Sequence, residues 1–155
     1  MTLDADALIE RAKVIISPAD AERARKALDR VVEKDAGGAL AAFLAENPKA
    51  RDLLFGVFGS SPYLADLAAR DPARLAAALA ADPQARVEAL IEEARALETD
   101  DEAELMRRLR LIKQEAALVI ALADLSKAWE TLQATNALTR IADATLSAAI
   151  RFTLR

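Results

Sequence analysis

The sequence predicts an all-α fold: an irregular multi-helix bundle of short helices packed around two long C-terminal helices. Of the 155 residues, 54% are hydrophobic and only 4% are aromatic. Alanine and leucine, both strong helix formers, supply much of the apolar share. Each proline follows a serine, asparagine or aspartate, and apolar residues recur at three- and four-residue steps. We expect a single domain over residues 1–155, with short helices over 1–98 and a long helix pair over 99–155.

Composition limits the available chemistry and the classes of partner. The sequence contains neither cysteine nor histidine, which removes disulfides, thiolate nucleophiles and the commonest general base and metal ligand. The formal charge is −4, with both signs spread along the chain, so we expect no nucleic-acid partner. The longest apolar run, residues 116–123, is far shorter than the roughly 20 residues that span a bilayer. With no secretory signal visible, we expect a cytoplasmic protein with no membrane partner.

The five X-Pro pairs predict helix starts, because proline is tolerated at the first helical position and the preceding residue can cap. We expect helices over about residues 3–15, 18–34, 39–45, 48–59, 72–81 and 83–97. Gly37-Gly38 ends the second of these helices. After Ser61-Pro62, a further turn places Tyr63 in a structural position.

The long central helix is predicted to begin at a Thr99-Asp100 cap, with Glu104 able to pair with Arg108. Its inward stripe comprises Leu105, Leu109, Ile112, Ala116, Val119 and Ala123. A break near residues 124–127 follows, where we expect Asp124 to cap and Trp129 to lie in the core. The last helix is predicted to bury Leu138, Ile141, Ala142, Thr145, Ala149 and Phe152. It has no glycine or proline stop, so we expect the chain to continue beyond Arg155.

Three patterns have some features of catalytic or metal sites, and each favours a structural interpretation. Gly59-Ser60 resembles the start of a nucleotidyltransferase site, but no Asp-x-Asp pair follows it, so a helix end is favoured. Asp4-Ala5-Asp6 has the carboxylate spacing, yet acidic residues also favour a helix start. The acidic cluster of residues 100–104 could hold a hard cation, although a solvated helix start is favoured. We therefore assign no catalytic, cofactor-binding or metal residue in this chain.

A basic cluster on the central helix is the candidate interaction face. Arg107, Arg108, Arg110 and Lys113 could receive a phosphate or an acidic partner. The possible interaction face comprises Arg107, Arg110, Lys113 and Glu115. The alternative is an exposed face in which the cations pair with neighbouring carboxylates.

An ordered series of short matches resembles a known family. Arg110-x-x-Lys113-x-Glu115-Ala-Ala-Leu, Ala121-Leu-Ala-Asp-Leu, Trp129, Leu138-Thr and Ala142-Asp-Ala are similar to the bacterial glutamine synthetase adenylyltransferase/deadenylylase, as are Ser61-Pro-Tyr-Leu and Arg70-Asp-Pro upstream. The resemblance covers most of the chain from about Phe58. The family's catalytic signature, a glycine-rich turn followed by an Asp-x-Asp metal pair, is absent from this sequence.

The resemblance implies a helical N-terminal segment of the deadenylylase half, followed by the nucleotidyltransferase domain. It implies that the parent enzyme transfers AMP from ATP to a tyrosine of glutamine synthetase. The same enzyme would remove AMP by phosphorolysis under control of a PII signalling protein. Mg²⁺ and ATP or ADP would bind beyond this chain, which alone should be inactive. The competing hypothesis is a free-standing helical adaptor that binds partners through a groove.

Overall fold

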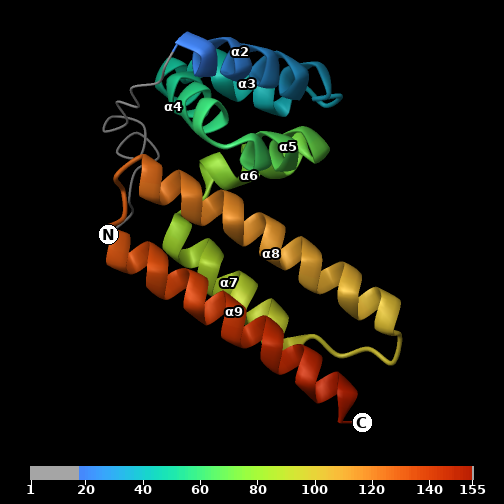
Figure 1. Ribbon diagram of the computed structural model, residues 1–155. Helices are drawn as coiled ribbons and strands as arrows, with labels where there is room; N and C mark the ends of the chain where they lie inside the picture. The colour runs from blue at the N-terminus through green and yellow to red at the C-terminus, as the bar shows by residue number, and fades with distance from the viewer. Residues whose placement is uncertain (1–17, 155) are drawn as a thin grey trace.

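The computed structural model describes residues 18–154, and every regular element in that part of the chain is an α-helix (Figure 1). The all-α prediction is therefore confirmed. The helix predicted over residues 3–15 lies outside the described residues. The helices are α2 (Pro18–Glu33), α3 (Ala39–Glu46), α4 (Pro48–Ser60), α5 (Pro62–Arg70), α6 (Pro72–Ala80), α7 (Pro83–Ala96), α8 (Glu102–Leu125) and α9 (Thr131–Thr153).

Proline and its preceding residue set most of the helix starts, as the sequence predicted. The side chains of Ser61, Asp71 and Asp82 each accept a hydrogen bond from the backbone N–H three residues on, at 3.3, 2.9 and 2.7 Å. These bonds satisfy donors that the first turn leaves unpaired. Asn47 differs from the other capping residues, because its amide donates to the Phe43 carbonyl at 2.9 Å. It therefore closes α3 instead of capping α4.

The short helices α2 to α6 form one part of the molecule. Here α2 packs against α4 and α5, while α3 packs against α4 and α6. Leu54 and Phe58 of α4 are fully buried at the centre of this part. The turn before α3 depends on Gly38, whose φ of 66° lies in the left-handed region that glycine adopts without a Cβ penalty.

The second part is a three-helix bundle of α7, α8 and α9, which run alongside one another (Figure 1). Although the sequence grouped α7 with the short helices, it packs against both long helices. The two parts share α8, which also contacts α4, α5 and α6. One continuous hydrophobic core therefore runs through both parts, and a small second cluster around Leu97 and Leu105 closes the far end of the bundle.

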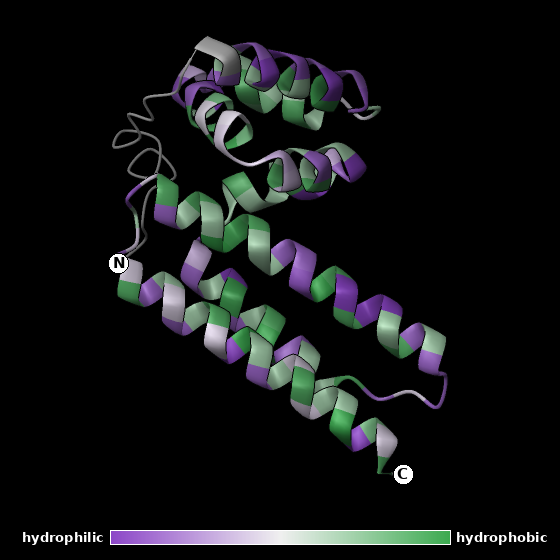
Figure 2. Cartoon of the chain, viewed as in Figure 1, coloured by the Kyte–Doolittle hydropathy of each residue, from purple (hydrophilic) through white to green (hydrophobic). Residues whose placement is uncertain are grey.

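The inward stripe predicted for α8 is confirmed at all six positions. In the colouring of Figure 2, the polar residues of α8 gather on its first half, away from the short helices. No helix within residues 18–154 is long and apolar enough to cross a membrane.

The stripe predicted for α9 is confirmed at Ile141 and Thr145 and wrong at the exposed positions. Leu138 is 52% exposed and Ala142 is also exposed, while Ala149 and Phe152 are only partly buried. The buried positions are Ala134, Ala137, Ile141, Ala144, Thr145 and Ala148. Small side chains dominate this face, so the α9 backbone can lie close to α7 and α8. The larger apolar side chains of α9 remain on the outside.

Candidate functional site

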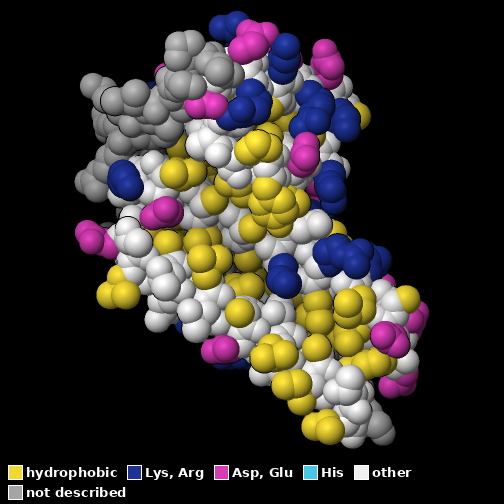
Figure 3. Space-filling view, in the orientation of Figure 1, with side chains coloured by type: hydrophobic (Ala, Val, Ile, Leu, Met, Phe, Trp, Pro, Cys, Tyr) yellow, Lys and Arg dark blue, Asp and Glu magenta, His cyan; other side chains and the backbone are white. Residues whose placement is uncertain are grey.

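The candidate site is a groove between α8 and α9, with α5 at its edge, whose lining includes both apolar and basic side chains. It has a volume of about 550 Å³ and is lined by Tyr63 of α5, by Met106, Leu109, Arg110, Lys113 and Gln114 of α8, and by Ala142, Thr145 and Leu146 of α9. Figure 3 shows hydrophobic side chains gathered over the bundle, with lysine and arginine side chains beside them. The groove thus combines apolar walls with two cations.

Arg110 and Lys113, two members of the candidate interaction face, lie together in this groove. Both side chains are exposed, and neither makes a hydrogen bond or an ion pair within the described part of the chain. They are therefore available to a carboxylate or phosphate from outside.

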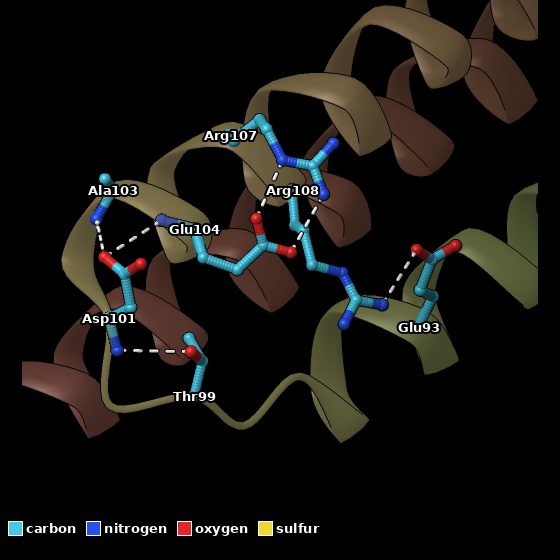
Figure 4. Close-up of polar contacts among 7 residues, drawn as sticks. All are labelled: Glu93, Thr99, Asp101, Ala103, Glu104, Arg107 and Arg108. Atoms are coloured by element: carbon cyan, nitrogen blue, oxygen red, sulfur yellow. Dashed lines mark hydrogen bonds and ion pairs between the residues drawn. The ribbon is translucent and has the colours of Figure 1, made fainter.

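Arg107 does not line the groove, and it is already paired. Its guanidinium donates two hydrogen bonds of 2.8 Å to the carboxylate of Glu104 (Figure 4). The pairing raises the pKa of Arg107 and lowers that of Glu104. The expected Glu104–Arg108 pair does not form, because Arg108 reaches Glu93 of α7 at 3.4 Å. Of the four predicted residues, Arg110 and Lys113 therefore line the groove and Arg107 and Glu115 do not.

Glu115 is turned away from the groove and toward α7. Its carboxylate accepts a hydrogen bond from Arg86 at 2.5 Å, and only 16% of its side chain is exposed. This bond raises the pKa of Arg86. A second pair, Arg140 of α9 with Glu88, ties α9 to the same helix and lowers the pKa of the Glu88 carboxyl. Glu115 therefore holds α8 against α7.

The first turn of α8 shows why its acidic cluster serves as a cap. Asp101, and not the predicted Thr99-Asp100 pair, is the N-cap residue. Its carboxylate accepts from the N–H groups of Ala103 and Glu104 at 2.9 and 3.4 Å, while the Thr99 hydroxyl accepts from the Asp101 N–H (Figure 4). A negative charge here also suits the helix dipole.

The Gly59-Ser60 pair is part of a helix. Gly59 is buried within α4, and the Ser60 hydroxyl donates to the Gly56 carbonyl at 2.9 Å. The helix ends one residue later than predicted, with Ser61 as its C-cap. A helical backbone has no free N–H groups to cradle a phosphate, so these residues do not fit a nucleotide site.

Asp4 and Asp6 lie outside the described residues. Within residues 18–154, no three acidic side chains come together as a possible metal site.

The three residues predicted to be structural have different environments. Trp129 is 4% exposed and lies in the core, as predicted, whereas Tyr63 is 60% exposed at the groove. The side chain of Asp124 has no hydrogen-bond partner among the described residues. The expectation that Asp124 caps was wrong, because a carboxylate cannot donate to the free carbonyls at a helix C-terminus. The buried Ser126 hydroxyl and the backbone N–H of Trp129 both donate to the Ala123 carbonyl instead, at 3.2 and 3.0 Å.

Sequence reasoning missed the apolar half of the groove and the pairs that fix the bundle. Met106 and Leu146 are 50% and 60% exposed, although each lies on a helix with a well-defined buried face. The available signal was the row Leu138, Ala142, Leu146 and Ile150, at four-residue steps on α9. The alanines at 134, 137, 144 and 148 form one apolar face of α9. The row of larger side chains therefore indicates a second apolar face on the same helix.

The fold and its groove define a class: an all-α domain with a solvent-exposed groove that has apolar and basic lining. Comparison with known proteins then places the chain more narrowly. The family model for glutamate-ammonia ligase adenylyltransferase matches residues 52–155. The chain therefore belongs to this family, and the free-standing adaptor hypothesis is not favoured.

The relatives share one printed description, bifunctional glutamine synthetase adenylyltransferase/adenylyl-removing enzyme. The protein of Bradyrhizobium diazoefficiens is 45% identical over 114 residues, which is 72% of this chain and 12% of the relative. That of Xanthobacter autotrophicus is 40% identical over 139 residues, or 87% of this chain and 14% of the relative. The Mesorhizobium japonicum protein is 39% identical over 146 residues, which is 90% of this chain and 15% of the relative. The chain thus spans a small part of these relatives, and no solved structure matches it.

Proposed function

We propose that this chain is a helical segment of a bifunctional glutamine synthetase adenylyltransferase/adenylyl-removing enzyme, and that it positions the catalytic domain without carrying out AMP transfer. The observation that carries this proposal is the family match over residues 52–155, which contain the whole α7–α9 bundle. Its location at the N-terminal end of the deadenylylase half is part of the proposal and rests on the resemblance.

The proposed reactions belong to the whole enzyme. Transfer of AMP to a tyrosine of glutamine synthetase, and its phosphorolytic removal, both need acidic metal ligands that neutralise phosphate charge as the bond is exchanged. We place those ligands, Mg²⁺ and ATP or ADP outside this chain, in the following nucleotidyltransferase domain. Glutamine synthetase and a PII protein are the proposed partners, and the cytoplasm is the proposed compartment.

The contacts of α7 with both long helices support a positional role. Hydrogen-bonded pairs tie α7 to both long helices: Arg86 pairs with Glu115 of α8, and Glu88 pairs with Arg140 of α9. The core shared with the short helices holds the other half of α8. A segment fixed in this way can hold a neighbouring domain in one orientation. Holding reacting groups in the correct geometry lowers the barrier of a reaction.

An assay of ADP release tests the proposal directly. Purified chain is mixed with adenylylated glutamine synthetase, phosphate and Mg²⁺, beside a protein-free control. We expect no turnover above the control, whereas a chain extended through the nucleotidyltransferase domain should release ADP. Turnover by the present chain would refute the positional role.

A surface variant of the extended chain tests whether the groove cations contribute to that role. Arg110→Gln with Lys113→Gln should slow ADP release without changing the denaturation midpoint, because neither side chain has a partner among residues 18–154. Glu115→Gln is the contrasting variant, since it removes the charged partner of Arg86 and should lower the midpoint. Unchanged turnover in the double variant would remove Arg110 and Lys113 from the proposal.

A further inference from the structure

The groove between α8 and α9 has the dimensions of a helix-binding site. Its α8 wall runs from Met106 to Lys113, a rise of about 10 Å or two helical turns. On α9 the groove is lined by Ala142, Thr145 and Leu146. Leu138 and Ile150 continue the row of Ala142 and Leu146 beyond the groove at four-residue steps, so that the whole ridge is about 18 Å long. A helix packs by placing its own ridge between two such rows.

The exposed apolar side chains show that this face is uncovered within the described chain. Leu138, Leu146 and Ile150 are 52%, 60% and 47% exposed, and Met106 of the opposite wall is 50% exposed. Scattered exposed leucines are ordinary, but a contiguous row beside a groove is typical of a binding surface. The opposite face of α9 is already packed against α7 and α8.

Charge distinguishes the kind of helix that fits. The neighbouring cations Arg107 and Arg108 are neutralised by Glu104 and Glu93. By contrast, Arg110 and Lys113 line the groove and have no carboxylate partner in the described part of the chain. An occupant with carboxylates along one side would complete these pairs at the edge of an apolar contact, where such pairs contribute to specificity.

We propose that this groove binds an acidic amphipathic helix of another protein domain. Apolar residues at i, i+4 and i+7 of that helix enter between Met106 and Leu146, and its carboxylates pair with Arg110 and Lys113. The inference goes beyond the positional role proposed above, because it rests on the lining of the groove and not on the enzyme's activity.

The probe is a fluorescein-labelled synthetic peptide of about 18 residues, long enough to form a helix with leucines at i, i+4 and i+7. One peptide carries glutamates beside the leucines, and a matched peptide carries lysines. Fluorescence anisotropy measures the binding of each to the full chain. We expect the acidic peptide to bind about tenfold more tightly than the basic one. Equal affinities would overturn the electrostatic basis of the proposal.

Variants of the protein locate the contact. Leu146→Ser should weaken binding of the acidic peptide about tenfold. Leu132→Ser is the matched control and should leave binding unchanged, since Leu132 is 80% exposed on the same helix outside the groove. Arg110→Glu with Lys113→Glu should reverse the peptide preference. Lys26→Glu with Arg51→Glu makes the same change of net charge outside the groove and should leave the peptide preference unchanged. Circular dichroism of every variant checks that it is folded.

Two results would overturn the proposal. The first is peptide binding that neither Leu146→Ser nor the groove charge reversal affects, which would place the contact elsewhere. The second is self-association in sedimentation experiments that Leu146→Ser abolishes, because the occupant would then be a second copy of this chain.

Discussion

Replacing Leu118 by alanine tests whether α8 is the central helix of the fold. Leu118 is 2% exposed and belongs to the continuous core that joins the two parts of the molecule. The substitution removes three carbon atoms, or roughly 2.4 kcal/mol at about 0.8 kcal/mol each. The cavity left in a close-packed site adds to this loss, so the free energy of unfolding should fall by about 2–5 kcal/mol.

Leu109→Ala provides an internal comparison on the same helix. Leu109 is 7% exposed, belongs to the small cluster with Leu97, Leu105 and Ala148, and lines the groove. A space opened at the surface can collapse or admit water, so we expect a cost at the lower end of the range, about 2–3 kcal/mol.

Urea denaturation followed by far-UV circular dichroism measures both costs, with a stability loss read from the midpoint at constant slope. Leu132→Ala, at a position that is 80% exposed, is the control and should stay within about 0.5 kcal/mol of the parent. An unchanged midpoint for Leu118→Ala would refute the central role of α8, and a larger loss for Leu109→Ala would refute the argument that a space opened at the surface costs less.

Two further predictions concern the turn before α3 and the pairing of α7 with α9. Gly38→Ala should destabilise by about 1 kcal/mol, because an L-residue in the left-handed region is strained, whereas Gly37→Ala should not. An added Cβ meets nothing within 4 Å at either position, so equal midpoints would refute the backbone argument. The Arg140 hydrogen bonds hold the pKa of Glu88 below its ordinary value of 4.5. Stability from this pair is therefore complete above that value and is lost as pH falls through the lowered pKa. The midpoint difference between the parent and Glu88→Gln should shrink below about pH 4.5, and a constant difference would exclude this linkage.

The helix starts could be predicted from the sequence because they depend on local chemistry. A proline fixes its own φ, and Ser61, Asp71 or Asp82 bonds a donor only three residues away. Asn47 shows the limit of this reasoning. The Asn47 side chain could bond to the helix it precedes or to the helix it follows, and in the structure it bonds to the Phe43 carbonyl of α3.

The orientation of α9 and the pairing of charges could not be predicted in the same way. The sequence contains two apolar faces on α9, and hydrophobicity alone favours the one with the larger side chains, Leu138 among them. Close packing against α7 and α8 favours the alanine-rich face instead, because small residues allow the backbones to approach. Arg108 likewise has acidic neighbours on α8, but its partner Glu93 comes from α7. Such partners depend on tertiary geometry.

The family match covers the part of the chain that contains the groove. Residues 52–155 contain all of α5 to α9, including every residue that lines the groove. Helices α2 and α3 lie outside the match and cover only the short-helix part. The half of α8 after Lys113 is held by the shared core, whereas its first half presents Met106 and Arg110 at the surface. The short helices thus hold one end of α8 in the shared core, and the other end of α8 lies at the surface of the bundle.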